Sequence, residues 1–471
     1  MGKVSRSRLS AGVMKALGIF GSLEALKILC SVARTKLVAI WIGAAGVGVI
    51  SLYSATIDMI RSIALLNLRQ SSVPAIASAS DDERPHLVQS VDVLGLIIGV
   101  IATIIVTILS PLLSWLTFGS YDYSWGFALL APTLLAYSVG DARQAILQGV
   151  GRLGVLAKAS LYAVVASTVV AIPLFYFFRM AAIVPVLIVF PSFSALFLFV
   201  GPATKVKRTT LDRALFKSTV SSLIKLGSYL TVGISMGFAA DYALRAYLSW
   251  NAGVETVGLF QSGYTIIKSY VGLFFTAITM EFFPRLSATI SRRSYTSVIV
   301  AHEIGLALWV LMPVVVVFIA SDHLIVRLLY SSSFLDIVPY VSIAVTATLL
   351  RAVSWCFSYV IVAKGDGKVY ILTEGLSAVT LLGFSWLGWH FGGYAGLGWA
   401  YLGEYVVFTA ATWAVCHFRY GLRMPAGIVW LAVFSSAVAA AALLLKVWLG
   451  WWAPLVLAVP LAFAAFKRIR S

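Results

Sequence analysis

The chain consists largely of long apolar stretches separated by short polar segments. A transmembrane helix needs about 20 mostly apolar residues, and stretches of this length recur along the whole sequence. They predict fourteen spans, of which the first is overlong and the last two are separated by only a few residues. The predicted spans are residues 12–40, 44–66, 89–112, 125–147, 156–177, 181–202, 220–246, 256–283, 296–320, 337–362, 368–389, 395–416, 427–446 and 452–466. This pattern predicts an all-α polytopic membrane protein.

The basic residues give this arrangement an orientation. If the N-terminus is inside, most of the 35 Lys and Arg residues lie at cytoplasmic ends and loops, and only Arg179, Arg327 and Lys446 lie in external segments. Such an excess is typical of the cytoplasmic side of a membrane protein. Both termini are therefore predicted to be cytoplasmic. The net charge of +17 is explained by topology, and no nucleic-acid partner is expected.

The two halves of the chain resemble each other. Gly48 recurs as Gly258 and Pro74 recurs as Pro284, in each case 210 positions later. The sequence QGVGR at 148–152 parallels KGDGK at 364–368. Because six spans per half is an even number, the two halves are expected to be parallel repeats.

The repeat also predicts how the chain is divided. The expected parts are an N-terminal lobe at 1–204, a basic cytoplasmic linker at 205–219, a C-terminal lobe at 220–420 and an extension of two further spans at 421–471.

Charged residues lie within or close to the apolar stretches, where each costs roughly 2.5–3.5 kcal/mol on the mildest scale. Opposite charges one turn apart, such as Asp58 with Arg61, neutralise each other, and static ion pairs that fix helix packing are one interpretation. Bases outnumber acids, however, and a surplus of buried cations indicates an anionic ligand such as a diphosphate. The candidate binding residues are Lys27, Arg34, Arg61, Arg245, Lys268 and Arg351. The candidate ion-coupling acids are Glu24, Asp58, Asp241 and Glu374, and Glu404 is a further acid without an obvious local base.

Several motifs of other protein classes are missing from the sequence. There is no Gly-rich phosphate loop that ends in Lys-Ser or Lys-Thr, no His-Glu-x-x-His and no His/Cys cluster, so neither ATP hydrolysis nor a metal cofactor is expected. The longest predicted external loop, at about 321–336, is too short to hold an active site of its own. An enzyme is therefore not expected.

Three segments resemble a known family. KLVAIWIGAAGVGVISLY in the first two spans, VGLFQSGYTIIKSYVGLFFTAITMEFFPRLS at span 8 and FSYVIVAKGDGKVYILTEG at spans 10–11 are similar to the Wzx-type lipid-linked oligosaccharide flippases, including the O-antigen and enterobacterial common antigen types. This is the polysaccharide transporter branch of the MOP exporter superfamily. The resemblance implies a MATE-like fold of two six-helix lobes, a cationic central cavity and a basic residue at the position of Arg34.

The function expected from this resemblance is transport of undecaprenyl-diphosphate-linked oligosaccharide across the bacterial inner membrane by alternating access. The transport could be coupled to an ion gradient. Surface polysaccharide, such as O-antigen, capsule or exopolysaccharide, would be the product. Expected partners are this lipid-linked glycan, membrane lipids and other assembly proteins such as a polymerase or a chain-length regulator. The alternatives are a MATE-like drug or metabolite antiporter, a membrane glycan polymerase or ligase, and a scaffold.

Overall fold

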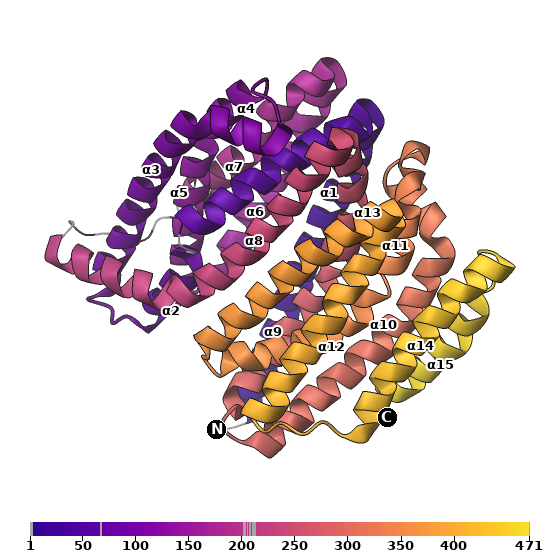
Figure 1. Cartoon of the computed structure of the whole chain (residues 1–471). Helices are drawn as coiled ribbons and strands as arrows, with labels where there is room; N and C mark the ends of the chain where they lie inside the picture. The colour runs from indigo at the N-terminus through magenta and orange to yellow at the C-terminus, as the bar shows by residue number, and fades with distance from the viewer. Residues whose placement is uncertain are drawn as a thin grey trace. The chain divides into compact units, whose positions relative to one another are not determined.

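The structure is a computed structural model that describes residues 3–65, 68–200, 204, 206, 209 and 213–470. Side chains within these ranges are described from residue 26 onward, except for 28, 213–215, 222, 224–230, 270, 273, 276, 277, 280, 469 and 470. The described chain is helical and contains no strand. The prediction of an all-α fold is confirmed (Figure 1).

The chain forms two compact units. The first contains residues 1–231 and 249–254, and the second contains residues 232–248 and 255–471. The helices of the first unit are α1 (Lys3–Ala64), α2 (Leu68–Ser78), α3 (Arg84–Phe118), α4 (Ser124–Leu130), α5 (Pro132–Gly149), α6 (Leu153–Phe178), the 3-10 turn η1 (Arg179–Ala182) and α7 (Ile183–Phe199). Helix α8 (Arg213–Tyr264) contributes to both units. The predicted boundaries of the lobes and the linker stay a prediction.

The second unit continues from α8 to the end of the chain. Its elements are the π-helix η3 (Thr265–Tyr270), α9 (Gly272–Thr289), α10 (Arg293–Leu329), the 3-10 turn η4 (Ser332–Ile337), α11 (Val338–Ala344), α12 (Ala347–Ala363), α13 (Gly367–Ala414), the π-helix η5 (Val415–Arg419), α14 (Ala426–Leu449) and α15 (Leu455–Arg470). Each of the fourteen predicted spans falls mainly on one of these helices, on one arm of a broken helix or on two or three consecutive helical elements.

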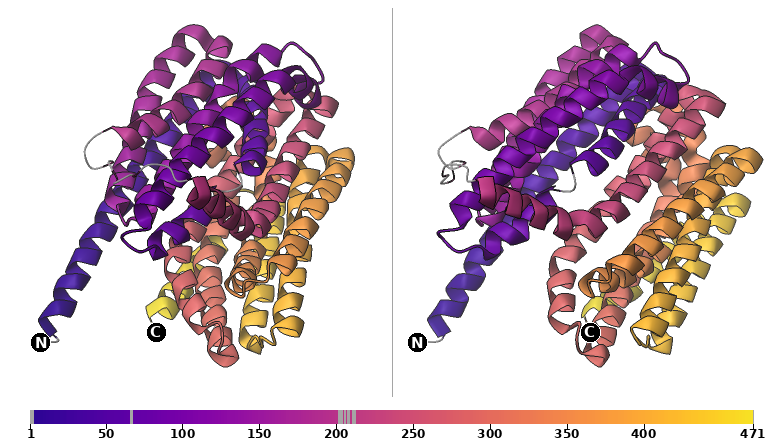
Figure 2. Two further views of the ribbon diagram at one scale, coloured as in Figure 1. Left: turned by 90° about the vertical axis from the view of Figure 1, so that its left-hand side faces the viewer. Right: turned by 60° about the vertical axis from the view of Figure 1, so that its left-hand side comes forward.

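Within each unit the helices run alongside one another (Figure 2). In the first unit α3 packs on α5, and α6 packs on both α1 and α7. Its core includes Tyr53, whose ring meets that of Phe127 edge-on at 4.8 Å. In the second unit α13 packs on α11 and α12, while α14 and α15 pack on α10. The helices of the predicted extension are therefore attached to this unit.

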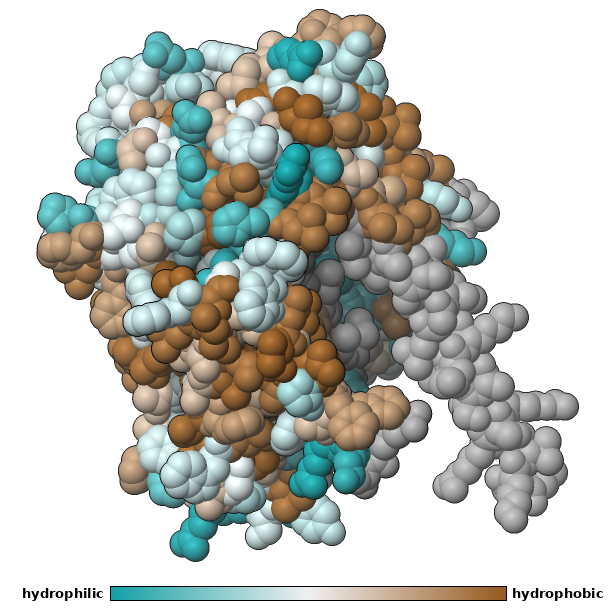
Figure 3. All heavy atoms as spheres, turned by 90° about the vertical axis from the view of Figure 1, so that its right-hand side faces the viewer, coloured by the Kyte–Doolittle hydropathy of each residue, from teal (hydrophilic) through white to brown (hydrophobic). Residues whose placement is uncertain are grey.

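The surface is the reverse of that of a water-soluble protein. Large apolar side chains such as Phe391, Val447 and Trp448 are about four-fifths exposed, at 82, 80 and 82%, and apolar areas are prominent in Figure 3. Six described helical stretches, or seven with the bent pair Ser332–Ala344 and Ala347–Ala363, are long and apolar enough to cross a membrane. Because contiguous apolar surface of this extent needs a nonpolar solvent, the protein is a multi-pass membrane protein.

The repeat is visible in the backbone. The helical conformation is interrupted at Gly43 in α1 and at Gly253 in α8, 210 positions apart, and both glycines have positive φ angles, of 66° and 86°. A second pair lies 214 positions apart: Arg179 (φ 51°, ψ −122°) and Gly393 (φ 52°, ψ −130°). Positive φ favours glycine, and Arg179 is the described non-glycine residue that adopts it.

The parallel between QGVGR and KGDGK needs a correction. The sequence match aligns Gly149 with Gly365, but the glycines with positive φ are Gly151 and Gly365 (76° and 67°), which are 214 positions apart. In both halves this glycine is the second residue after a helix end and is followed, after one residue, by the next helix. The helix ends therefore show that Gly151 corresponds to Gly365, which the match of residue letters did not.

We predict that Gly393→Ala destabilises the protein by about 1–3 kcal/mol, because its backbone conformation is unfavourable for a residue with a Cβ atom. Its neighbour Gly392 is the matched control. A Cβ atom would meet nothing within 4 Å at either position, but Gly392 does not have positive φ. Gly392→Ala should be neutral or slightly stabilising. Thermal unfolding in detergent measures both, and equal melting temperatures would contradict the prediction.

Candidate functional site

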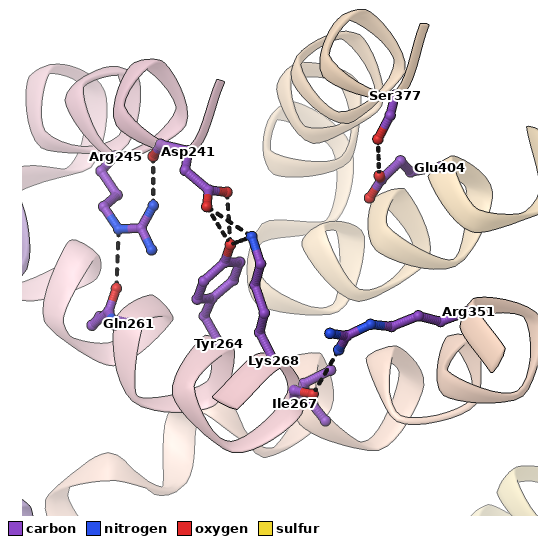
Figure 4. Close-up of polar contacts among 9 residues, drawn as sticks. All are labelled: Asp241, Arg245, Gln261, Tyr264, Ile267, Lys268, Arg351, Ser377 and Glu404. Atoms are coloured by element: carbon purple, nitrogen blue, oxygen red, sulfur yellow. Dashed lines mark hydrogen bonds and ion pairs between the residues drawn. The ribbon is translucent and has the colours of Figure 1, made fainter. Parts of the chain in front are cut away.

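The second unit contains a cluster of charged and polar side chains built by a helical hairpin in α8. The chain reverses at Gly253, and three pairs of side chains on opposite sides of it are in contact: Arg245 with Gln261, Asp241 with Tyr264, and Asp241 with Lys268. The residue numbers of each pair are nearly symmetric about Gly253, as expected for two antiparallel arms. Figure 4 shows the resulting cluster.

The carboxylate of Asp241 lies at its centre. It accepts hydrogen bonds from the Tyr264 hydroxyl at 2.7 and 2.6 Å and from the Lys268 ammonium at 2.8 Å. Lys268 also donates to the Tyr264 hydroxyl. The Asp241 side chain is 16% exposed, whereas that of Lys268 is 45% exposed. The acid is therefore enclosed, and the base that neutralises it remains accessible.

Lys268 lies in the π-helix Thr265–Tyr270. Short π-helical segments are rare and frequently occur at functional sites. The wider turn places Lys268 and Tyr264, four residues apart, on the same side of the helix, where the Lys268 Nζ atom is 4.8 Å from the centre of the Tyr264 ring. This local geometry was not predictable from the hydropathy pattern.

Arg245 is held rigidly beside this group. It is 5% exposed and donates through Nε to the Gln261 side chain at 3.0 Å and through one terminal nitrogen to the Asp241 carbonyl at 2.5 Å. Its guanidinium carbon lies 4.7 Å from the centre of the Tyr264 ring. A delocalised cation over an aromatic face is stabilised electrostatically.

Arg351 of α12 reaches the same region from the other side (Figure 4). Within the described part of the chain it donates one hydrogen bond, to the carbonyl of Ile267 at 3.3 Å, and it stacks on Phe275 at 4.8 Å. A guanidinium has five N–H donors. Most of the donors of this half-buried cation therefore have no acceptor among the described residues.

Two further predicted acids of the second unit lie on α13. Glu404 is 5% exposed and accepts a hydrogen bond from the Ser377 hydroxyl at 2.7 Å. Glu374 is half-buried, one turn before Ser377. Among the predicted residues of this unit, Arg245, Lys268 and Arg351 are bases, and Asp241, Glu374 and Glu404 are acids.

The first unit contains a separate ion pair. The Arg61 guanidinium donates to both carboxylate oxygens of Asp141, with three contacts of 2.8, 2.8 and 3.2 Å, and lies 4.3 Å from the centre of the Tyr137 ring. Arg61 thus binds an acid of α5. The sequence had paired it with Asp58, one turn away in α1; Asp58 is half-buried.

The remaining predicted residues lie on the first arm of α1. Lys27 and Arg34 are half-buried. The side chain of Glu24 lies outside the described residues. The structure therefore brings together Asp241, Arg245 and Lys268, with Arg351 beside them, and it assigns Arg61 to a pair of its own.

Several charged residues that form buried ion pairs were not predicted from the sequence. One is Asp141, and a second buried pair joins Arg143 to Asp92 at 3.4 Å. All three lie inside predicted spans. They are charged residues within apolar stretches, as Asp58 is, and could have been selected on the same ground. Asp322 of α10 is fully buried and binds Lys446 of α14, a residue that was assigned to an external segment. The sequence did not identify Tyr264 and Gln261 as site residues, because uncharged polar residues are common in any helix.

The cluster of the second unit contains the basic residue types that proteins use to bind phosphate. Arginine donates paired hydrogen bonds to phosphate, and a lysine adds a mobile point charge. Among the described residues no group of three or more His, Cys, Asp and Glu side chains is arranged to hold a metal ion.

Comparison with known proteins identifies the family and the fold. The family described as "Polysaccharide biosynthesis protein" matches residues 48–339. None of the curated proteins compared with the chain matches it.

Solved structures with the same fold include the lipid II flippase MurJ in an inward closed conformation, with 12% identity over 96% of this chain and 98% of that one and a TM-score of 0.71. An inward-facing multidrug resistance MATE family transporter of the MOP superfamily has 15% identity over 87% and 95% of the two chains and a TM-score of 0.66. A MOP superfamily transporter from Pyrococcus furiosus, described as having a binding pocket of reverse polarity that suggests a different function, has 16% identity over 89% and 93% and a TM-score of 0.61.

The Arg61–Asp141 pair gives a test of the static interpretation of buried charges. We predict that Asp141→Ala destabilises the protein by about 1–3 kcal/mol, because it leaves a partly buried guanidinium without its acceptor. The double variant Arg61→Met/Asp141→Leu should recover most of that loss. Melting temperatures in detergent provide the comparison, and additive effects of the two changes would show that the pair contributes no coupling energy.

Proposed function

The chain belongs to the polysaccharide biosynthesis protein family, and from that premise we propose that it is a flippase for undecaprenyl-diphosphate-linked oligosaccharide units in the bacterial inner membrane. The fold is that of MOP superfamily transporters, and one protein with this fold is a lipid II flippase. Both observations support a lipid-linked substrate. The fold and family are those of transporters, which makes an enzyme the poorer assignment. The proposed product is surface polysaccharide, and both termini are proposed to be cytoplasmic.

The observation that carries the proposal is how few hydrogen-bond acceptors surround the Arg351 guanidinium among the described residues. A guanidinium between membrane-spanning helices needs acceptors, and among the described residues this one has a single carbonyl, at 3.3 Å, and an aromatic face. A diphosphate presents several oxygens that match its donors. Lys268, which follows Ile267 in the chain and is accessible, would supply a second cation to the same anion.

The other predicted bases have proposed roles of different kinds. Arg245 is enclosed and engaged by Gln261 and the Asp241 carbonyl, so it would set the local potential and hold the hairpin. Lys27, Arg34 and Arg61 are the proposed substrate-binding bases of the first unit, although Arg61 already binds Asp141. Alternating access is the proposed mode of transport.

Ion coupling is proposed at Asp241. Substrate phosphate and the Asp241 carboxylate would compete for Lys268. A carboxylate that loses its cation in nonpolar surroundings becomes a favourable site for a proton, so arrival of the anion and uptake of a proton would be linked. Glu24, Asp58 and Glu374 are the other acids proposed for this role.

A second candidate function is a MATE-like antiporter for small molecules. The observation in its favour is the pair of acids in α13: Glu404, which binds a neutral hydroxyl, and half-buried Glu374. Acids of this kind suit a cationic substrate. Loss of drug resistance in a deletion strain, with normal surface glycan, would favour this alternative.

We predict that Arg351→Gln reduces substrate affinity about 10- to 150-fold, because one to two charge-assisted hydrogen bonds are worth about 1.5–3 kcal/mol. Arg327→Gln is the control, since Arg327 is an exposed base near the end of α10. In a deletion strain, the measurement is the leaflet in which the lipid-linked glycan accumulates. The Arg351 variant should leave it on the cytoplasmic side at normal expression, and the control should restore export. Full export by Arg351→Gln would show that Arg351 is not needed to bind the substrate.

A separate prediction concerns coupling. Asp241→Asn cannot exchange a proton, so transport by this variant in proteoliposomes should lose its dependence on an imposed proton gradient. Tyr264→Phe serves as the control, because it removes a hydrogen bond to the same carboxylate but keeps the acid. If both variants respond to the gradient like the wild type, Asp241 is not the coupling residue.

A further inference from the structure

A second site lies in the same unit, away from the cluster around Asp241. It is a groove of about 1050 Å³ between α14 and the second arm of α13, and residues of α11 contribute to it. Helix α14 packs on α10 and α12. The groove therefore lies along the side of α14 that faces α13. A volume of this size is at the upper end of the range for small-molecule sites.

The walls of the groove are mostly apolar, although Thr346 and Ser436 also line it. From α14 they include Ala440, Leu443 and Val447, at helical spacing on one face, and from α13 they include Trp399 and Val406. Several wall residues are well exposed, with Trp399 at 57% and Val447 at 80%. Both helices are membrane-spanning, so this exposed apolar surface faces lipid. The expected occupant is a hydrocarbon chain.

One end of the groove is polar. It is formed by Lys446, Ser342, His323 and Asp336. Behind them is the carboxylate of Asp322, which is 0% exposed and accepts hydrogen bonds from the Lys446 ammonium, the Ser342 hydroxyl and the backbone N–H of His323. The Nδ1 atom of His323 is also 2.9 Å from it. Asp322 therefore has its full set of partners.

Lys446 retains donor capacity. An ammonium has three N–H donors, and its protein acceptors among the described residues are the carboxylate of Asp322 and the hydroxyl of Ser342. The third donor is available at the end of the groove, which Lys446 lines. Asp322 offsets the charge of Lys446, and Asp336, an exposed acid, also lines the groove, so these residues give the groove no net positive charge. An acceptor that belongs to a head group without net charge fits this arrangement better than a purely anionic one.

We propose that this groove binds a diacyl phospholipid with a zwitterionic head group. An acyl chain would lie between α13 and α14, a phosphate or ester oxygen would accept a hydrogen bond from Lys446, and the head-group ammonium would lie near Asp336. The lipid would fill the groove and so join α14 to α13. This site is independent of the transport substrate proposed above.

The test uses the full-length protein in nanodiscs of mixed phosphatidylethanolamine and phosphatidylglycerol, with bound lipid measured by native mass spectrometry. Ala440→Phe fills the groove. Its control is Ala437→Phe, one turn earlier on α14 and likewise exposed, but outside the groove lining. Retention of phosphatidylethanolamine should fall in Ala440→Phe, because the ring takes the space of the acyl chain and the chain loses its packing contacts there, and stay unchanged in Ala437→Phe.

A second variant covers a failure of Ala440→Phe to fold. Val447→Phe obstructs the groove at a residue that is largely exposed, so it is compatible with folding, and it should show the same loss. Equal retention in all variants would overturn the proposal. So would preferential retention of phosphatidylglycerol, which would show an anion site, or displacement of the phospholipid by an isoprenoid diphosphate, which would show that the groove belongs to the transport substrate.

Discussion

The structure depends on one constraint: a charge placed between membrane helices must be given partners there. Most of the polar interior follows from it. Asp141 pairs with Arg61, Asp92 with Arg143, Asp322 with Lys446, and Asp241 with Lys268. These pairs join segments that are far apart in sequence, so they fix packing as well as neutralise charge. Arg351 differs from these pairs: among the described residues its partners are the Ile267 carbonyl and the Phe275 ring, and not a carboxylate.

The glycine breaks determine which charges can meet. A reversal at Gly253 sets the arms of α8 side by side and brings Asp241 opposite Tyr264 and Lys268. The equivalent break at Gly43 shapes α1 in the first unit. The two copies of the repeat share this backbone framework but not the side chains on it, since Asp58 occupies the position that corresponds to Lys268. The two copies thus share an arrangement of helices but differ in the charged side chains that these helices carry.

Much of the fold was predictable from the sequence, and less of the site. Length and apolarity locate the fourteen spans because lipid tolerates few other solutions than helices. The charged members of the cluster were found for the same reason, as costly residues in apolar segments. Pairing was not predictable: Arg61 has Asp58 one turn away, but the geometry of the bundle gives it Asp141. Gln261 and the π-helix at Thr265–Tyr270 depend on the hairpin, which local patterns do not specify.

The buried contact between Asp322 and Lys446 has a consequence for the assembly of the protein in the cell. These residues are 124 positions apart, so during synthesis α10 enters the membrane long before the ribosome has made α14. In that interval the carboxylate of Asp322 lacks its cation. The charge of Asp322 can therefore be paired with that of Lys446 only after the C-terminal helices have been made.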